Sequence, residues 1–104
     1  MEDEKNKNIN FGLIRKLDEK NRLIIPASIV ERNRILDGQE LYIQKYADKA
    51  CIFIKEPEDE YLTVIYKKGH GITFPEDSGL DDFFGEEVRI LEFRGGFSIF
   101  PYKK

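Results

Sequence analysis

Hydrophobic and polar positions alternate along much of the chain and predict short strands joined by turns. Residues 12–17 alternate as a strand, residues 18–21 (Asp-Glu-Lys-Asn) are turn formers, and residues 22–26 return as a second strand ending on a proline. We therefore expect a β-hairpin. Asn21 falls late in its turn, where positive φ is often required and asparagine tolerates it better than most residues.

A short helix and a second hairpin follow. Residues 26–34 begin with Pro26, which suits the first turn of a helix, and Asn33 is a plausible left-handed terminator. After the Asp37-Gly38 turn, Leu41 and Ile43 share one face of a strand, and residues 50–55 complete a strand, strand, helix, strand, strand unit.

The remainder of the chain resembles the same ββαββ unit. Residues 61–75 align with residues 12–26 at a shift of 49, which pairs Leu13 with Leu62 and Pro26 with Pro75. After two residues are removed from the second helix region, the shift is 47. This shift gives the pairs Gly38–Gly85, Glu40–Glu87, Leu41–Val88, Ile43–Ile90, Ile52–Ile99 and Phe53–Phe100. The pattern favours an internal duplication, although self-similar alternation is also common in β-rich chains.

The predicted organisation is a disordered tail over residues 1–11, a half-unit over 12–55, a linker over 56–60 and a divergent second half-unit over 61–104. A unit of this size buries too little apolar surface to fold alone. It needs a second copy, supplied either by the other half of the chain as an intramolecular pseudo-dimer or by another chain as a homodimer. The sequence leaves both arrangements open.

Composition narrows the class of protein. The chain has 104 residues and a net charge of −3, an overall balance unlike that of a typical nucleic-acid binder. No apolar run approaches a membrane span and the first residues are acidic, so we expect a soluble, cytoplasmic protein without membrane contact. Cys51 lies in an apolar run and is expected to be a core residue rather than a reactive thiol.

Residues 12–55 resemble the swapped-hairpin DNA-binding domain of the AbrB, MazE and SpoVT group of bacterial and archaeal regulators. The resemblance rests on Gly-Leu-Ile-Arg-Lys at 12–16, Asp-Glu-x-x-Arg at 18–22, an apolar run into Ile-Pro at 25–26, a short helix, Asp-Gly at 37–38 and a final apolar hairpin. It implies a mainly β fold with short helices, a swapped-hairpin β-barrel of two ββαββ half-units. It also implies double-stranded DNA as the partner and a role in transcription regulation.

The resemblance places DNA-contacting arginines at Arg15 and Arg22, with Lys16 and Lys20 adding charge nearby. In the helix the family's adjacent basic pair is replaced by Val30 and Glu31, so the basic charge moves to Arg32 and Arg34, the latter standing where a glycine is usual. Within residues 12–34 there are 6 basic and 3 acidic side chains. Positive charge is thus concentrated where the resemblance places DNA.

The second half departs from this pattern. Val64 replaces Arg15, Gly71 replaces Arg22, and the carboxylates of residues 76–87 would repel phosphate. This half is expected to act as a scaffold or to offer an acidic surface to a protein partner. The turn at 67–71 (Lys-Lys-Gly-His-Gly) is either a phosphate cradle or simply a flexible hairpin tip.

Other functional classes have weaker support. His70 is the only histidine and has no evident nucleophile or orienting acid, and no phosphate-binding fingerprint is present, so we expect no enzymatic activity, no cofactor and no metal site. The alternatives are the antitoxin of a toxin–antitoxin pair, a role associated with the same group, and a scaffold that does not bind DNA.

Overall fold

The computed structural model describes residues 12–102. Over this range the chain is mainly β with two short α-helices, which confirms the predicted class at that level. The expected tail, residues 1–11, and residues 103–104 lie outside the described residues. The elements are β1 (Leu13–Lys16), β2 (Arg22–Leu23), α2 (Ala27–Arg32), β3 (Glu40–Lys45), β4 (Ala50–Phe53), β5 (Leu62–Ile65), β6 (Ile72–Thr73), the 3-10 helix η1 (Glu76–Ser78), α3 (Leu80–Phe84), β7 (Glu87–Phe93) and β8 (Gly96–Pro101).

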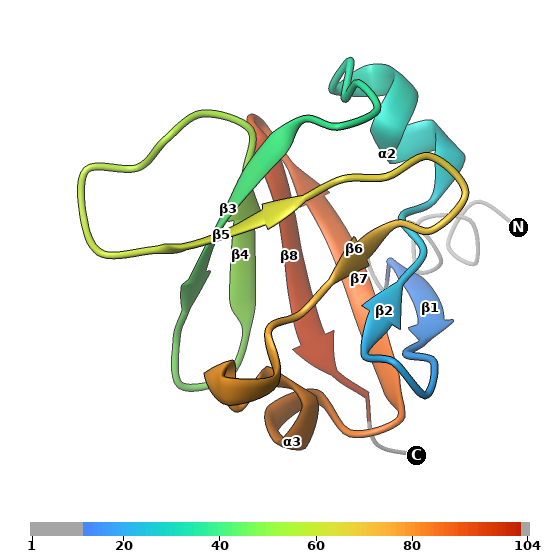
Figure 1. Cartoon of the computed structure of the whole chain (residues 1–104), viewed down its shortest axis with the longest axis vertical. Helices are drawn as coiled ribbons and strands as arrows, with labels where there is room; N and C mark the ends of the chain where they lie inside the picture. Colours follow the sequence, from blue (N-terminus) through green and yellow to red (C-terminus); the bar gives the residue numbers. More distant parts are fainter. Residues whose placement is uncertain (1–11, 103–104) are drawn as a thin grey trace, which may run out of the picture.

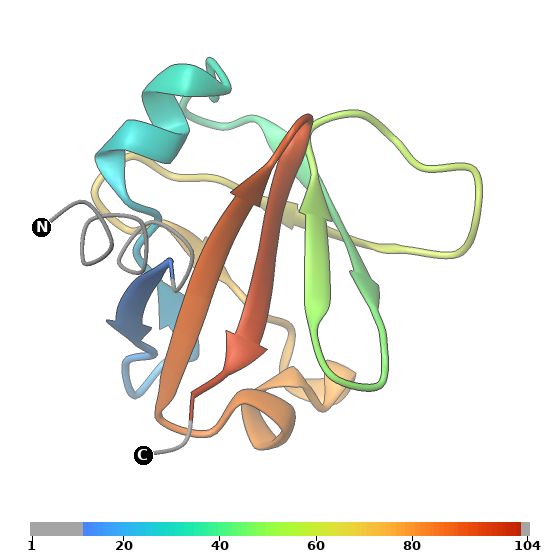
Figure 2. The same ribbon diagram turned by 180° about the vertical axis from the view of Figure 1, so that it is seen from behind.

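Antiparallel pairing arranges the strands in two sheets. The larger has six strands in the order β1-β7-β8-β4-β3-β5, and the smaller is a ribbon of β2 and β6. In Figure 1 the ribbon lies in front of the larger sheet, with α2 and α3 at opposite ends of the molecule. Figure 2 shows the other side, where β7, β8, β4 and β3 run next to one another.

Strand pairing crosses between the two halves of the chain. In the first half, β1 pairs with β7 of the second half, and in the second half, β5 pairs with β3 of the first. The registers correspond: Leu13 pairs with Ile90, and the counterparts of these residues at shifts of 49 and 47, Leu62 and Ile43, pair with each other. The pairing is therefore reproduced when the two halves are exchanged.

Two pairs mark where an approximate two-fold axis passes through the molecule. In the ribbon, Leu23 pairs with Ile72, its own counterpart at a shift of 49. In the large sheet, Cys51 pairs with Ser98, its own counterpart at a shift of 47. A residue that pairs with its own counterpart lies next to the axis. Cys51 is buried there, with its Sγ 3.5 Å from Ser98 Oγ, so the expectation of a core cysteine is confirmed.

The closed barrel that the resemblance implied is not formed by the strand ladders of residues 12–102. The six-stranded sheet is open, and only the single bridges Leu17–Leu23 and Lys67–Gly71 connect its edges to the ribbon. The reason is the length of the ribbon strands. Both β2 and β6 have only two residues, and each is soon followed by a proline, Pro26 or Pro75, which cannot donate to a ladder.

The local expectations around α2 are confirmed in part. Asn21 has a φ of 59° as predicted, and α2 begins directly after Pro26. The prediction for Asn33 is wrong: its φ is −92°, and Arg34 takes the left-handed conformation with a φ of 54°. The Asn33 side chain donates to the Ile29 carbonyl at 2.9 Å, which holds Asn33 in the helical turn, so the chain reverses one residue later.

Both halves contribute side chains to one hydrophobic core. Leu41 and Ile43 are buried on the same face of β3, as their alternation predicts. The largest fully buried side chains are Leu23, Ile29, Leu41, Ile43, Ile52, Ile72, Phe74, Leu80, Val88, Ile90, Phe97 and Ile99. Because this core is shared, neither half keeps a complete core without the other. Within residues 12–102, no helix has the length and apolar character needed to cross a bilayer.

Candidate nucleic-acid interface

The turn between β1 and β2 is organised by one carboxylate. Asp18 Oδ1 accepts hydrogen bonds from the backbone N–H groups of Lys20 and Arg22, each at 2.9 Å, and its Oδ2 lies 2.6 Å from Nε of Arg22. The backbone N–H of Arg22 is the main reason that the pKa of Asp18 lies below its ordinary value. Asp18 is thus charged at neutral pH and fixes the start of the Arg22 side chain.

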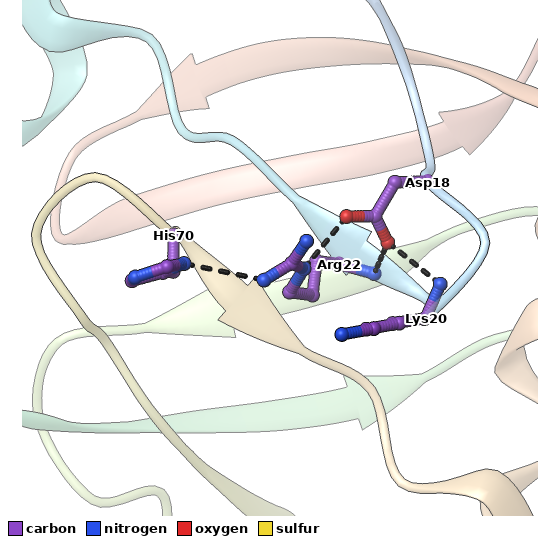
Figure 3. A network of polar contacts seen from close by, with 4 residues as sticks. All are labelled: Asp18, Lys20, Arg22 and His70. Atoms are coloured by element: carbon purple, nitrogen blue, oxygen red, sulfur yellow. Dashed lines mark hydrogen bonds and ion pairs between the residues drawn. The ribbon is translucent and has the colours of Figure 1, made fainter.

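Arg22 extends from this turn across the ribbon to the second half of the chain. Its Nη1 lies 3.2 Å from Nδ1 of His70, and Figure 3 shows the guanidinium between Asp18 on one side and His70 on the other. The Arg22 side chain is 32% exposed. Since a guanidinium can only donate, Nδ1 is the acceptor and the ring is neutral in this arrangement. Among residues 12–102, no hydrogen-bond acceptor is found for Nη2 of Arg22.

The other basic residues of the first hairpin do not gather around Arg22. Arg15 pairs with buried Val88, and Lys16 pairs with Glu87. Directly paired residues share a face and neighbours in a strand alternate, so Arg15 and Lys16 lie on opposite faces of β1. Arg15 is half-buried and its Nη1 donates to the Ile14 carbonyl at 2.8 Å. Lys20 is exposed in the turn beside Arg22, as Figure 3 shows.

The two basic residues expected from the helix region have different environments. Arg32 forms an ion pair with Glu92 of β7, with its Nε 2.8 Å from Oε1, and this hydrogen bond raises the pKa of Arg32. The positive charge of Arg32 is therefore compensated within the protein. Arg34 is exposed at the turn that ends the helix.

The turn at residues 67–71 is a closed hairpin held by the first half of the chain. The N–H of Lys67 donates to the Gly71 carbonyl at 2.9 Å, and the N–H of Gly71 donates back at 2.8 Å. The N–H of Lys68 donates to Oδ1 of Asp37 at 2.8 Å, and the N–H of Tyr66 donates to the Gln39 carbonyl at 2.8 Å. These bonds tie both the tip and the base of the hairpin to the loop before β3.

His70 is the residue whose position the sequence reading missed. It was assigned to an isolated turn without a partner, whereas the structure brings it to Arg22, 48 residues earlier in the chain. The signal lay in the internal alignment, because the shift of 49 places His70 opposite Asn21 and Gly71 opposite Arg22. Two hairpins related in this way lie side by side once β2 pairs with β6.

Comparison of the chain with family models, curated proteins and solved structures finds no match. Functional interpretation therefore depends on the residues and their geometry, together with the resemblance of residues 12–55 described above.

Proposed function

We propose that this protein is a DNA-binding transcriptional regulator of the AbrB-like class, and that its two ββαββ halves form a swapped-hairpin arrangement within one chain. The observation that carries the proposal is the crosswise strand register, in which each half supplies the strand that the other lacks. An arrangement of interleaved hairpins is what the resemblance of residues 12–55 implies. The two lines of support are independent, because the register is a property of backbone pairing and the resemblance is a property of side chains.

In this proposal Arg22 is the principal contact to DNA. Its guanidinium is oriented by Asp18 and His70, while Nη2 is available for an acceptor on DNA. A planar guanidinium donates to two acceptors at once, which suits a phosphate or the O6 and N7 edge of guanine. Arg15 would supply a second guanidinium, and Lys16, Lys20 and Arg34 would add attraction that does not depend on sequence. Arg32 contributes less, since Glu92 compensates its charge.

The antitoxin and scaffold alternatives receive less support. In the group that residues 12–55 resemble, an antitoxin usually wraps its toxin with an extended C-terminal segment. Here β5 to β8 lie within residues 62–101 and pair with strands of the first half. These residues are therefore already committed to the protein's own sheets. A scaffold without DNA binding is distinguished by the experiment below.

Selection from a randomised duplex library, followed by affinity measurements across a salt series, tests the proposed function. We expect enrichment of a particular sequence and a dissociation constant that rises with salt. Each phosphate contact contributes about 0.9 to the slope of log affinity against log salt, because counterions are released on binding. Contacts from Lys16, Lys20, Arg22 and Arg34 would give a slope of about −3 to −4. Absence of enrichment together with a slope near zero would rule out the proposal and leave the scaffold role.

A further inference from the structure

We propose that the hairpin at residues 67–71 is a second contact element for the same duplex, so that one chain presents a complete but asymmetric DNA-binding surface. The inference rests on the proposed function and goes beyond it. It assigns a binding role to a part of the second half whose acidic composition suggested a scaffold. Three observations carry it: the position of the hairpin, its local charge and its structural differences from the first hairpin.

The position of the hairpin follows from the ribbon. The pairing of β2 with β6 places Arg22 opposite Thr73 and Leu23 opposite Ile72, and the Nη1–Nδ1 contact of 3.2 Å joins Arg22 to His70. A duplex that reaches the guanidinium of Arg22 therefore also approaches the imidazole of His70. The second hairpin cannot be remote from a DNA site built on Arg22.

The charge of the second half is unevenly distributed. Residues 61–75 contain Lys67, Lys68 and His70 and no Asp or Glu, whereas residues 76–87 contain six carboxylates. The net charge of −4 over residues 57–104 therefore conceals a basic hairpin followed by an acidic segment. The hairpin attracts phosphate by the same counterion release as the first one, while the acidic segment disfavours approach of DNA at the α3 end.

The hairpin also has the donors that phosphate contacts need. Lys67, His70, Thr63 and Thr73 line one groove between β5 and β6. Ammonium and hydroxyl groups donate to phosphate oxygens without reading the base sequence. Because the hairpin is tied down through Lys68 and Tyr66, these donors are held in place before DNA binds, which lowers the entropic cost of binding.

The two hairpins are not equivalent, and this determines the kind of DNA site. Arg15 and Arg22 have Val64 and Gly71 as their counterparts at a shift of 49, so only the first hairpin carries guanidinium groups. We therefore expect base recognition at the first hairpin and phosphate anchoring at the second. Such a surface fits a non-palindromic duplex bound by one chain, because a palindrome would require equal hairpins.

His70 acts as a positioning residue for Arg22. It reaches Arg22 from the other half, and as an acceptor it fixes the direction in which Nη1 points, leaving Nη2 toward solvent. Removal of the acceptor frees the guanidinium to rotate. The sequence preference of Arg22 then weakens even though its charge remains, because bidentate recognition depends on orientation.

The lysine contribution is tested with the double variant K67Q/K68Q in the full chain, against the duplex selected by the wild-type protein and a scrambled duplex. Loss of two phosphate contacts is expected to reduce the magnitude of the salt slope by about 1.8 and to weaken binding at 0.1 M salt by about eightfold per contact, equally for both duplexes. The matched control is K45Q/K49Q, which removes the same charge from β3 and the turn that follows it. Equal behaviour of the two double variants would overturn the role of the hairpin.

The role of His70 is tested with H70A and H70N. The H70A variant is expected to reduce the ratio of affinities for selected and scrambled duplexes by about threefold to tenfold, the range for one hydrogen bond. In H70N the side-chain oxygen supplies an acceptor near the position of Nδ1, so the ratio should recover. His70 is exposed, so neither change disturbs the core. An unchanged ratio in H70A would contradict the positioning role.

The wild-type protein distinguishes failure of this inference from failure of the proposed function. If wild-type protein binds no duplex, both proposals fail. If the wild type binds its selected duplex and R22A weakens that binding, while K67Q/K68Q behaves like K45Q/K49Q, the proposed function stands and the second contact element does not exist. A stoichiometry of two chains per duplex at saturation would likewise overturn the single-chain site.

Discussion

Replacement of Arg22 by alanine is expected to remove most of the protein's preference for its selected duplex over a scrambled one. Arg22 is the one guanidinium in the first hairpin that is oriented on two sides, by Asp18 and by His70, and that still has free donors. A bidentate arginine contact to a base is worth about 1–3 kcal/mol of discrimination. The loss of preference should therefore be about fivefold to 150-fold, and non-specific binding should weaken by one phosphate contact at most.

Fluorescence anisotropy with the selected and scrambled duplexes provides the measurement, and two variants serve as controls. The R22K variant keeps the positive charge but lacks the planar fork, so it should retain non-specific affinity and lose the preference. The R94A variant removes an exposed arginine from the turn between β7 and β8 and should leave the preference unchanged. If R22A protein discriminates between the duplexes as well as the wild type does, Arg22 is not the reading residue.

The G71A variant is expected to be destabilised by about 3–5 kcal/mol, an unusually large effect for the addition of one methyl group. Gly71 has a φ of 75°, where a side chain costs about 1–2 kcal/mol. A Cβ at this position would also lie 1.9 Å from the Leu23 carbonyl oxygen. Because that oxygen belongs to the backbone, β2 and β6 would have to separate, which opens the packing of Leu23 and Ile72, both fully buried.

Chemical denaturation of G71A and G69A separates the two causes. Gly69 lies in the same hairpin with a φ of 84°, but a Cβ there would meet nothing within 4 Å. G69A should therefore lose only the conformational cost, about 1–2 kcal/mol, while G71A loses this and the pairing between the halves. Equal losses in the two variants would mean that the close approach of the hairpins across the ribbon does not exist in solution.

The features that the sequence predicted correctly are those encoded by neighbouring residues. Alternation located the hairpin strands, Asn21 signalled its positive φ, and Pro26 marked the start of the helix. The two alignment shifts also agree with the observed registers, because the buried positions in both halves must match for the strands to pair.

The features that it missed depend on contacts between distant segments. The error at Asn33 arose because its side chain bonds to Ile29 and also lies 3.1 Å from Glu92, 59 residues later. The compensation of Arg32 by Glu92 and the contact of Arg22 with His70 have the same origin. Sequence patterns indicate which face of a strand is buried, but they do not specify which exposed side chains from different elements will meet.

The most direct test of the proposed surface is NMR titration of isotopically labelled protein with the selected duplex. Amide resonances of residues 18–24 and 67–73, which contain the two hairpin turns and the ribbon, should shift together and saturate at one duplex per chain. Those of α3 and the turn between β3 and β4 should remain in place. If shifts are confined to α3 and the β3–β4 turn, or if none occur, a DNA-binding surface built from the two hairpins is contradicted.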